Sequence, residues 1–187
     1  MAKSLQGKRI AMLVTDGVER IEYEKPRASL EQREASVELI SPKKCGEKIQ
    51  GFNHLTPGSQ FTVEKAVEDA DPEDYDALVL PGGVANPDQL RLSRKAAEFV
   101  RHVGDTGRTL AAICHGPWLL INAELASGRH ITSWPSLETD LKNAGGPWSD
   151  EPVVVDGRFI TSRKPEDIPM FNMEIEKALS QTAGARA

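Results

Sequence analysis

Residues 109–117 read Thr-Leu-Ala-Ala-Ile-Cys-His-Gly-Pro. The apolar run 109–113 predicts a strand that is buried on both faces, as in a parallel sheet. Pro117 suits the first turn of a helix, so the predicted strand and helix meet directly at Cys114. A turn this tight is typical of a nucleophile elbow, which lifts one side chain to the top of a sheet.

The same alternation of strands and helices extends in both directions from this turn. Strands are expected at residues 9–15, 36–40, 61–63 and 76–80, with a loop or short hairpin over 42–60. Residues 152–161 predict a hairpin whose type I′ turn is Asp156-Gly157. Helices are expected at residues 21–33, 93–102, 117–126, 136–143 and 167–179. Such alternation predicts an α/β fold with a mostly parallel sheet covered by helices on both faces.

Particular residues predict where the helices begin and end. Pro26 is expected to confine the regular part of the first helix to its later turns. Ser93 is expected to cap the second helix, which should stop before Gly104. Gly128 suits the position after the helix that begins at Pro117.

Length and charge limit the class of protein. The 187 residues fit one domain, expected at 8–181 between tails at 1–7 and 182–187. A net charge of −5 argues against a dedicated nucleic-acid binder and against a polybasic membrane anchor. There is no apolar signal region, and no apolar run approaches the roughly 20 residues that span a bilayer. The two cysteines make neither a disulfide framework nor a zinc spacing, so we expect a cytoplasmic protein with reduced thiols.

Cys114 is the first candidate for chemistry. The N-terminus of the following helix favours an anion and therefore a thiolate. Backbone N–H groups near the turn can hold a developing oxyanion. A free cysteine is more often an inert packing residue, but the strand–Cys–His–Gly–Pro–helix pattern favours a reactive one.

His115 and Glu19 are candidate partners of the thiol. Adjacency in sequence does not show that the His115 ring faces Cys114. His115 therefore acts either as a base through its ring or as a hydrogen-bond donor through its backbone N–H. Glu19 follows the first strand and can reach the elbow. Burial raises a carboxyl pKa, and a protonated Glu19 can donate a hydrogen bond to a thiolate. Alternatively, Glu19 is a surface acid that opens a helix.

Two residues after the third buried strand are further candidates. Gly83 can offer its backbone N–H to a substrate oxygen, or it serves only in a turn. Asp88 either orients a histidine or caps a turn after Asn86-Pro87. Cys45 is interpreted as an accessory thiol, and His54, His102 and His130 are scattered without a metal spacing. Trp118, Trp134 and Trp148 either line a pocket or, as is more common, pack in the core or at an interface. No Gly-rich phosphate motif is present, and no metal or organic cofactor is required by the pattern.

Taken together, these motifs resemble the ThiJ/PfpI family of the class I glutamine amidotransferase-like superfamily. The matching segments run in family order over about residues 8–180: 9–15, 16–19, 74–83, 111–117, 132–134 and 153–165. The nearest resemblance is to bacterial PfpI-type stress proteins, some of which are described as intracellular peptidases. It implies a flavodoxin-like (Rossmann-like) sandwich with Cys114 on a strained elbow.

The resemblance also implies roles for individual residues. Glu19 would be the acid hydrogen-bonded to the thiol, and His115 the catalytic neighbour. The N–H groups of Gly83 and His115 would be oxyanion donors. Asp88 from a neighbouring subunit would orient the histidine, although it stands where the peptidase pattern has the longer glutamate.

Three functions follow from this resemblance and from the residues. The first is cofactor-free conversion of methylglyoxal to lactate, together with removal of early glyoxal adducts from protein or nucleotide groups. The second is an intracellular cysteine peptidase, and the third is a redox-sensing or chaperone-like stress protein without enzymatic turnover. The expected partners are small aldehydes or glycated substrates and further copies of the chain, in a homodimer or a higher homo-oligomer.

Overall fold

The computed structural model describes residues 4–181, and its centre is a seven-stranded sheet. The strand order is β6-β3-β1-β7-β8-β10-β9, and every neighbouring pair is parallel except β10 and β9. These strands are β1 (Arg9–Leu13), β3 (Ser36–Ser41), β6 (Lys65–Ala66), β7 (Ala77–Leu80), β8 (Thr109–Ile113), β9 (Val153–Asp156) and β10 (Phe159–Ser162). The predicted α/β fold with a mostly parallel sheet is confirmed.

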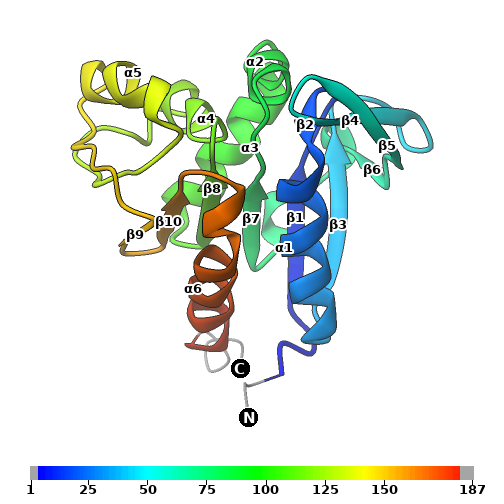
Figure 1. Ribbon diagram of the computed structural model, residues 1–187. Helices are drawn as coiled ribbons and strands as arrows, with labels where there is room; N and C mark the ends of the chain where they lie inside the picture. Colours follow the sequence, from blue (N-terminus) through cyan, green and yellow to red (C-terminus); the bar gives the residue numbers. More distant parts are fainter. Residues whose placement is uncertain (1–3, 182–187) are drawn as a thin grey trace.

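Helices cover both faces of this sheet (Figure 1). α1 (Arg20–Gln32) and α6 (Ile168–Gln181) pack side by side on one face. The other helices are α2 (Ala85–Leu90), α3 (Arg94–Asp105), α4 (Trp118–Asn122) and α5 (Glu138–Asn143), and α3 packs on β7 and β8. Within residues 4–181, no helix has both the length and the apolar character needed to cross a membrane.

The apolar strands supply two separate halves of the core. In β1, Ile10 and Met12 belong to the half beneath α1 and α6, while Ala11 and Leu13 belong to the half beneath α3. Side chains alternate along a strand, so a strand covered on both faces must be apolar at every position. The continuous apolar runs of the sequence therefore become the central strands.

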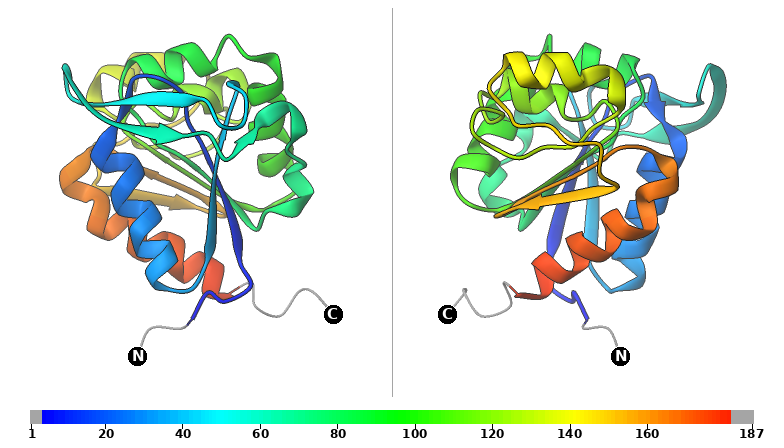
Figure 2. Two further views of the ribbon diagram at one scale, coloured as in Figure 1. Left: turned by 90° about the vertical axis from the view of Figure 1, so that its right-hand side faces the viewer. Right: turned by 60° about the vertical axis from the view of Figure 1, so that its left-hand side comes forward.

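A second, smaller sheet lies across the carboxyl end of the large one (Figure 2). Its order is β2-β4-β5, with β2 (Val18–Glu19), β4 (Lys48–Asn53) and β5 (Thr56–Thr62). β4 and β5 form a hairpin in which Asn53 pairs with Thr56, so the loop between them is His54-Leu55. The hairpin alternative for residues 42–60 is thus confirmed, and the short strand expected at 61–63 is the end of β5.

Two predicted helix boundaries are wrong. α1 is regular through Pro26, because a proline at the seventh helical position removes one hydrogen bond without stopping the packing of its buried side. α3 continues through Gly104 to Asp105, while Ser93 Oγ caps its start as expected by accepting from Ala96 N–H. A Cβ on Gly104 would lie 2.4 Å from Leu125 Cδ1, so this glycine permits close packing instead of ending the helix.

Other differences arise where single residues adopt left-handed backbone. α4 ends at Asn122 because Glu124 takes a φ of 59°, four residues before the expected glycine. The β9–β10 loop is Gly157-Arg158, one residue later than predicted, and only its glycine has positive φ, so a type I′ turn is not formed.

The sequence did not predict α2, and it assigned residues 1–7 to a tail. Leu5 is buried in the core, and its N–H donates to the Arg33 carbonyl oxygen. The expected tail at 182–187 lies outside the described residues.

Candidate active site

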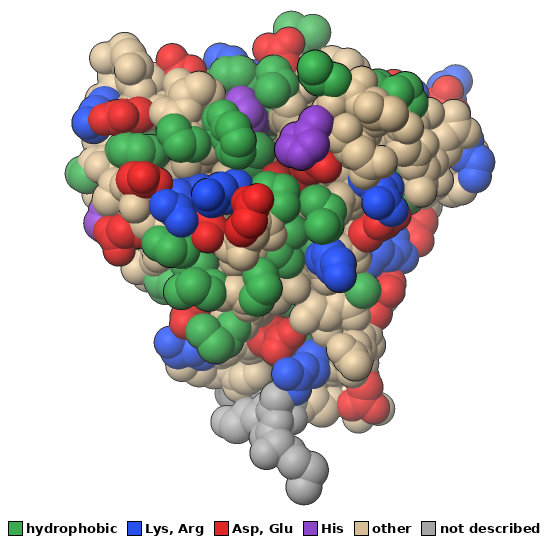
Figure 3. Space-filling view, in the orientation of Figure 1, with side chains coloured by type: hydrophobic (Ala, Val, Ile, Leu, Met, Phe, Trp, Pro, Cys, Tyr) green, Lys and Arg blue, Asp and Glu red, His purple; other side chains and the backbone are tan. Residues whose placement is uncertain are grey.

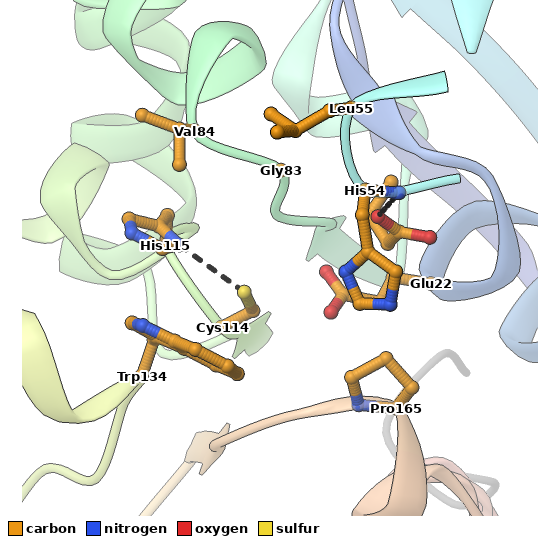
Figure 4. Close-up of a pocket in the computed structure, with 10 residues that line it drawn as sticks. Glu22, His54, Leu55, Gly83, Val84, Cys114, His115, Trp134 and Pro165 are labelled. Carbon is orange, nitrogen blue, oxygen red and sulfur yellow. Dashed lines mark hydrogen bonds between the residues drawn. The ribbon is translucent and has the colours of Figure 1, made fainter. Parts of the chain in front are cut away.

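A cavity of about 300 Å³ opens at the carboxyl ends of β1, β7 and β8. This is the edge where parallel α/β sheets bind ligands. Figure 4 shows the Cys114 sulfur between the His115 ring and the Glu22 carboxyl group. The lining residues come from six separate segments: Glu19, Glu22, His54, Leu55, Gly83, Val84, Cys114, His115, Trp134 and Pro165.

Cys114 has a backbone conformation that side-chain-bearing residues rarely adopt. Its φ is 61°, in the left-handed region. The surroundings hold it there, because its N–H donates to the Ser162 carbonyl at 3.0 Å and its carbonyl accepts from Trp134 N–H at 2.9 Å. The thiol is only 6% exposed and faces the cavity. The structure thus has the strained strand-to-helix turn that the sequence predicts.

Gly82 allows the groups around the thiol to approach each other. A Cβ on Gly82 would lie 2.6 Å from Cys114 Cβ and 2.6 Å from Glu22 Oε2. Contacts this short do not occur for a real side chain, so the Pro-Gly-Gly segment after β7 is needed for packing as well as for a turn.

Glu22, and not Glu19, is the acid beside the thiol. Glu22 lies on the buried side of α1 and has no exposed surface. Its Oε2 accepts from Gly82 N–H at 2.9 Å, and its carboxyl group interacts with the Cys114 thiol. Its Oε1 is buried and has no hydrogen-bond partner among residues 4–181.

The predicted contact between Glu19 and the thiol is therefore corrected. Glu19 is the residue before α1, and its Oε2 accepts from His54 N–H at 2.9 Å. It lines the cavity but ties down the tip of the β4–β5 hairpin. Glu19 stands before the first residue of α1 in extended backbone, whereas Glu22 shares the buried side of the helix with Pro26 and Leu30.

Burial makes Glu22 a weak acid. It raises the pKa of Glu22 to about 8, against which the Gly82 hydrogen bond acts only in part. Burial and the Glu22 charge also raise the pKa of the Cys114 thiol, while backbone hydrogen bonds from Gly83 and His115 lower it. The Cys114 thiol and the Glu22 carboxyl group are so close that their titrations are coupled, and the first proton lost belongs to the pair rather than to one residue. When Glu22 keeps the remaining proton, it no longer repels a thiolate and can donate a hydrogen bond to it.

The His115 ring does face the thiol. Its Nδ1 lies 3.2 Å from Cys114 Sγ. The ring is stacked on Trp134 at 6.0 Å between centroids and meets the edge of Trp118 at 5.3 Å. Burial lowers the pKa of His115, so the ring is neutral at neutral pH and can accept a proton.

Of the two remaining candidates, Gly83 lies beside the Cys114 sulfur and Asp88 lies on the surface. The N–H groups of Gly83 and His115 both donate to the Cys114 sulfur, so the two expected donors converge. Asp88 is exposed on α2. Within the described part of the chain, no carboxylate hydrogen-bonds to the His115 ring.

The sequence reasoning missed Glu22, His54, Leu55 and Pro165, and it favoured packing over a place in a pocket for Trp134, which lines the cavity. Glu22 could have been found, since Glu22, Pro26 and Leu30 recur every four residues and form the buried side of α1. His54 and Leu55 reach the cavity only because the hairpin lies over it, and no local pattern carries that information. Among residues 4–181, no three His, Cys, Asp or Glu side chains form a group that could hold a metal ion.

Comparisons with known proteins identify relatives over nearly the whole chain. A model of the DJ-1/PfpI family matches residues 8–178. Bacillus subtilis YraA, whose name carries a provisional assignment as a cysteine protease, is 40% identical over 89% of this chain and 95% of its own length. The protein/nucleic acid deglycase 2 of Escherichia coli is 38% identical over 92% of this chain and 98% of its own length. General stress protein 18 of Bacillus subtilis is also 38% identical, over 90% of this chain and 95% of its own length.

Solved structures share the fold. A two-domain protein from Anabaena variabilis, with DJ-1/ThiJ/PfpI-like and ferritin-like domains, superimposes with a TM-score of 0.88 at 31% identity. The match covers 96% of this chain and 50% of that one. Drosophila melanogaster DJ-1beta superimposes with a TM-score of 0.81 at 25% identity, over 94% of this chain and 95% of that one.

Proposed function

Since this chain belongs to the DJ-1/PfpI family, we propose that it is a cysteine-dependent enzyme acting on reactive dicarbonyls and their early adducts, without a cofactor. One observation carries the proposal: Cys114 Sγ is surrounded by two backbone N–H donors, a carboxyl group with a pKa of about 8 and a neutral imidazole. This set can create a thiolate and then move protons within a substrate attached to it.

The first step is attack on the aldehyde. The Cys114 sulfur forms a bond to C1 of methylglyoxal, and the thiol proton ends on the aldehyde oxygen to give a hemithioacetal. The N–H groups of Gly83 and His115 stabilise the oxygen while it carries negative charge. Protonated Glu22 stabilises the sulfur before attack.

The second step is an isomerisation in which C1 is oxidised while C2 is reduced. His115 Nδ1 removes the proton from C1 and returns a proton to C2, while the hydroxyl proton on the C1 oxygen passes to the C2 oxygen. C1 is thereby oxidised to a thioester, and the C2 ketone is reduced to an alcohol. Water then cleaves the thioester to lactate and free Cys114.

The same thiol can act on an early amine adduct. Attack at C1 forms the carbon–sulfur bond, breaks the carbon–nitrogen bond and sends the thiol proton to the leaving amine. The hemithioacetal that results is the one formed from free methylglyoxal, so both substrates share the later steps. The name of the Escherichia coli relative, a deglycase, is consistent with this chemistry.

Peptide cleavage is the second candidate, favoured by the 3.2 Å contact between His115 Nδ1 and Cys114 Sγ. An amide is a poorer electrophile than an aldehyde, and its leaving group needs a well-oriented acid. In this reading Asp88 of a second copy orients His115, in a homodimer or higher assembly. The lack of a carboxylate partner for His115 within residues 4–181 favours the aldehyde reaction for a single chain.

The test is lactate formation from methylglyoxal in amine-free buffer. We expect turnover by the wild type, and loss of at least about 10²-fold in Cys114→Ser, because the alcohol is a far weaker nucleophile at neutral pH. Cys45→Ser is the matched control, since Cys45 is exposed and outside the cavity, and it should keep full activity. Full activity in Cys114→Ser, or no turnover by folded wild type, would contradict the proposal.

A further inference from the structure

A second cavity of about 400 Å³ adjoins the first. The two share four lining residues: Glu19, His54, Trp134 and Pro165. Methylglyoxal has only five heavy atoms, whereas cavities of about 300 to 1,000 Å³ suit much larger ligands. The second cavity, which we call the outer cavity, is therefore space that a free dicarbonyl does not need.

The outer cavity carries charges of both signs. Arg20 is already paired, because its Nη1 contacts Glu24 Oε2 at 3.0 Å and its Nε donates to Asn53 Oδ1 at 2.8 Å. Lys164 is half-buried, and it makes no ion pair within residues 4–181. Glu166, two residues further along, is exposed and likewise has no cation partner in that range. Figure 3 shows acidic and basic side chains interspersed on the face that carries α1 and α6.

These observations describe a site for a ligand with a positive and a negative group close together. We propose that the outer cavity binds the α-carboxylate and α-ammonium of an amino acid whose side chain carries the dicarbonyl adduct to Cys114. Lys164 contacts the carboxylate and Glu166 contacts the ammonium group. This inference rests on the proposed function, and it names the adduct substrate of the same thiol.

The charges argue against a nucleotide as the natural occupant. A nucleotide phosphate is favoured by Lys164 but repelled by Glu19 and Glu166, which line the same cavity. An amino acid with both of its charged groups meets a complementary charge for each. Trp134, Ile21 and Pro165 leave apolar surface for the stem of its side chain.

The experiment compares two adducts that differ only at their ends. Methylglyoxal adducts of L-arginine and of N-acetyl-L-argininamide, whose α-groups carry no charge, are supplied to the wild type, Lys164→Gln and Lys25→Gln. Lys25 is the matched control, because it is an exposed lysine of α1 outside both cavities and its replacement removes the same charge. Lactate release gives KM and kcat for each adduct.

We expect Lys164→Gln to raise KM for the arginine adduct about tenfold, as for loss of a charge-assisted hydrogen bond, with kcat unchanged. Lys164→Gln should not affect the adduct with blocked α-groups or free methylglyoxal, and Lys25→Gln should behave as the wild type. Equal effects of Lys164→Gln on both adducts, or no preference of the wild type for the adduct with charged α-groups, would overturn the proposal.

A binding measurement separates this inference from the proposed function. Tryptophan fluorescence of Cys114→Ala, which cannot react, is titrated with L-arginine, N-acetyl-L-argininamide and AMP. Arginine binding that requires Lys164 supports the outer site even when the wild type makes no lactate from methylglyoxal, a result that rejects only the proposed function. Tighter Lys164-dependent binding of AMP than of arginine would overturn the amino acid assignment.

Discussion

At the scale of single residues, Cys114 and Glu22 are two ionisable residues that lie buried beside each other. A fully buried carboxylate is costly unless it is neutralised or strongly hydrogen-bonded. Glu22 receives one N–H bond, from Gly82, and its pKa of about 8 keeps it protonated at neutral pH. The neutral carboxyl group is what makes a hydrogen bond to a neighbouring thiolate possible.

The proton that Glu22 keeps makes the free energy of unfolding depend on pH. The pKa of Glu22 is raised on folding from 4.5 to about 8, so the native state binds more protons than the unfolded state between these pH values. Stability must therefore fall as pH rises through this window, by up to about 1.4 kcal/mol per pH unit. Glu22→Gln removes this slope, because the amide does not titrate.

Urea unfolding at pH 5.5 and 7.5 checks this prediction. From the lower to the higher pH, the wild type should lose on the order of 2 kcal/mol more unfolding free energy than Glu22→Gln does. Glu68→Gln is the control, since Glu68 is an exposed acid outside the cavity and its replacement removes the same charge, so the fall in stability with pH should remain. Parallel curves for the wild type and Glu22→Gln would contradict a buried, neutral Glu22.

At this scale the sequence predicts that Cys114, His115 and Gly83 lie together, and the structure has all three lining one cavity, while their catalytic roles stay predictions. Glu19 also lines the cavity, but its carboxyl group bonds to His54 N–H instead of the thiol. The first three belong to the ends of strands, whose positions follow from apolar runs. Glu19 lies before α1 in extended backbone, whereas Glu22 lies on the buried side of the helix. The recurrence of Glu22, Pro26 and Leu30 every four residues carries that information in the sequence.

At the scale of elements, close approach between α3 and the segment after α4 limits what the helix can carry. Gly104 lies in α3 against the buried side chain of Leu125. An alanine there would gain about 1 kcal/mol of helix propensity but would place its Cβ within 2.4 Å of Leu125 Cδ1. Because the core around Leu125 is packed, the steric cost should outweigh the gain.

We therefore expect Gly104→Ala to lower the free energy of unfolding by about 1–3 kcal/mol. The same change made in a Leu125→Ala background should be neutral or stabilising, because the obstructing side chain is gone. Chemical denaturation of the four proteins of this double-mutant cycle measures both effects. A stabilising Gly104→Ala in the wild-type background would show that α3 can move away.

The hairpin is the element that most changes the site. It brings His54 and Leu55 over a cavity whose base is formed by the sheet, and Leu55 is 94% exposed at its tip. Residues 42–60 contain glycine, proline and polar residues that suit a loop as well as a hairpin. Local propensity left both alternatives open, and pairing with β2 decided between them.

At the scale of the whole molecule, a second copy of the chain can supply the carboxylate that orients the His115 ring. Asp88 is exposed on α2 and is free to meet another copy. For an oligomer in which Asp88 of one copy bonds to His115 of the next, Asp88→Asn should lower kcat about tenfold or more while leaving the assembly intact. Asp69→Asn, which changes another exposed acid, is the control.

Sedimentation across a range of concentrations, run with the activity assay, checks this prediction. A monomer at the concentrations assayed, or full activity of Asp88→Asn in an intact oligomer, would exclude a role for Asp88 in orienting His115. Loss of activity on dilution, in step with dissociation, would support it.

The sequence by itself determined the alternation of the central strands with the longer helices, the mostly parallel sheet and the turn at Cys114. These depend on the burial pattern within short segments, which apolar runs and helical periodicity record directly. Only the tertiary structure decided that Glu22 reaches the thiol, that the hairpin tip closes over it, and that Lys164 faces an adjoining cavity. Contacts of this kind join segments far apart in the chain, and they depend on how whole elements rotate and pack, which no local pattern specifies.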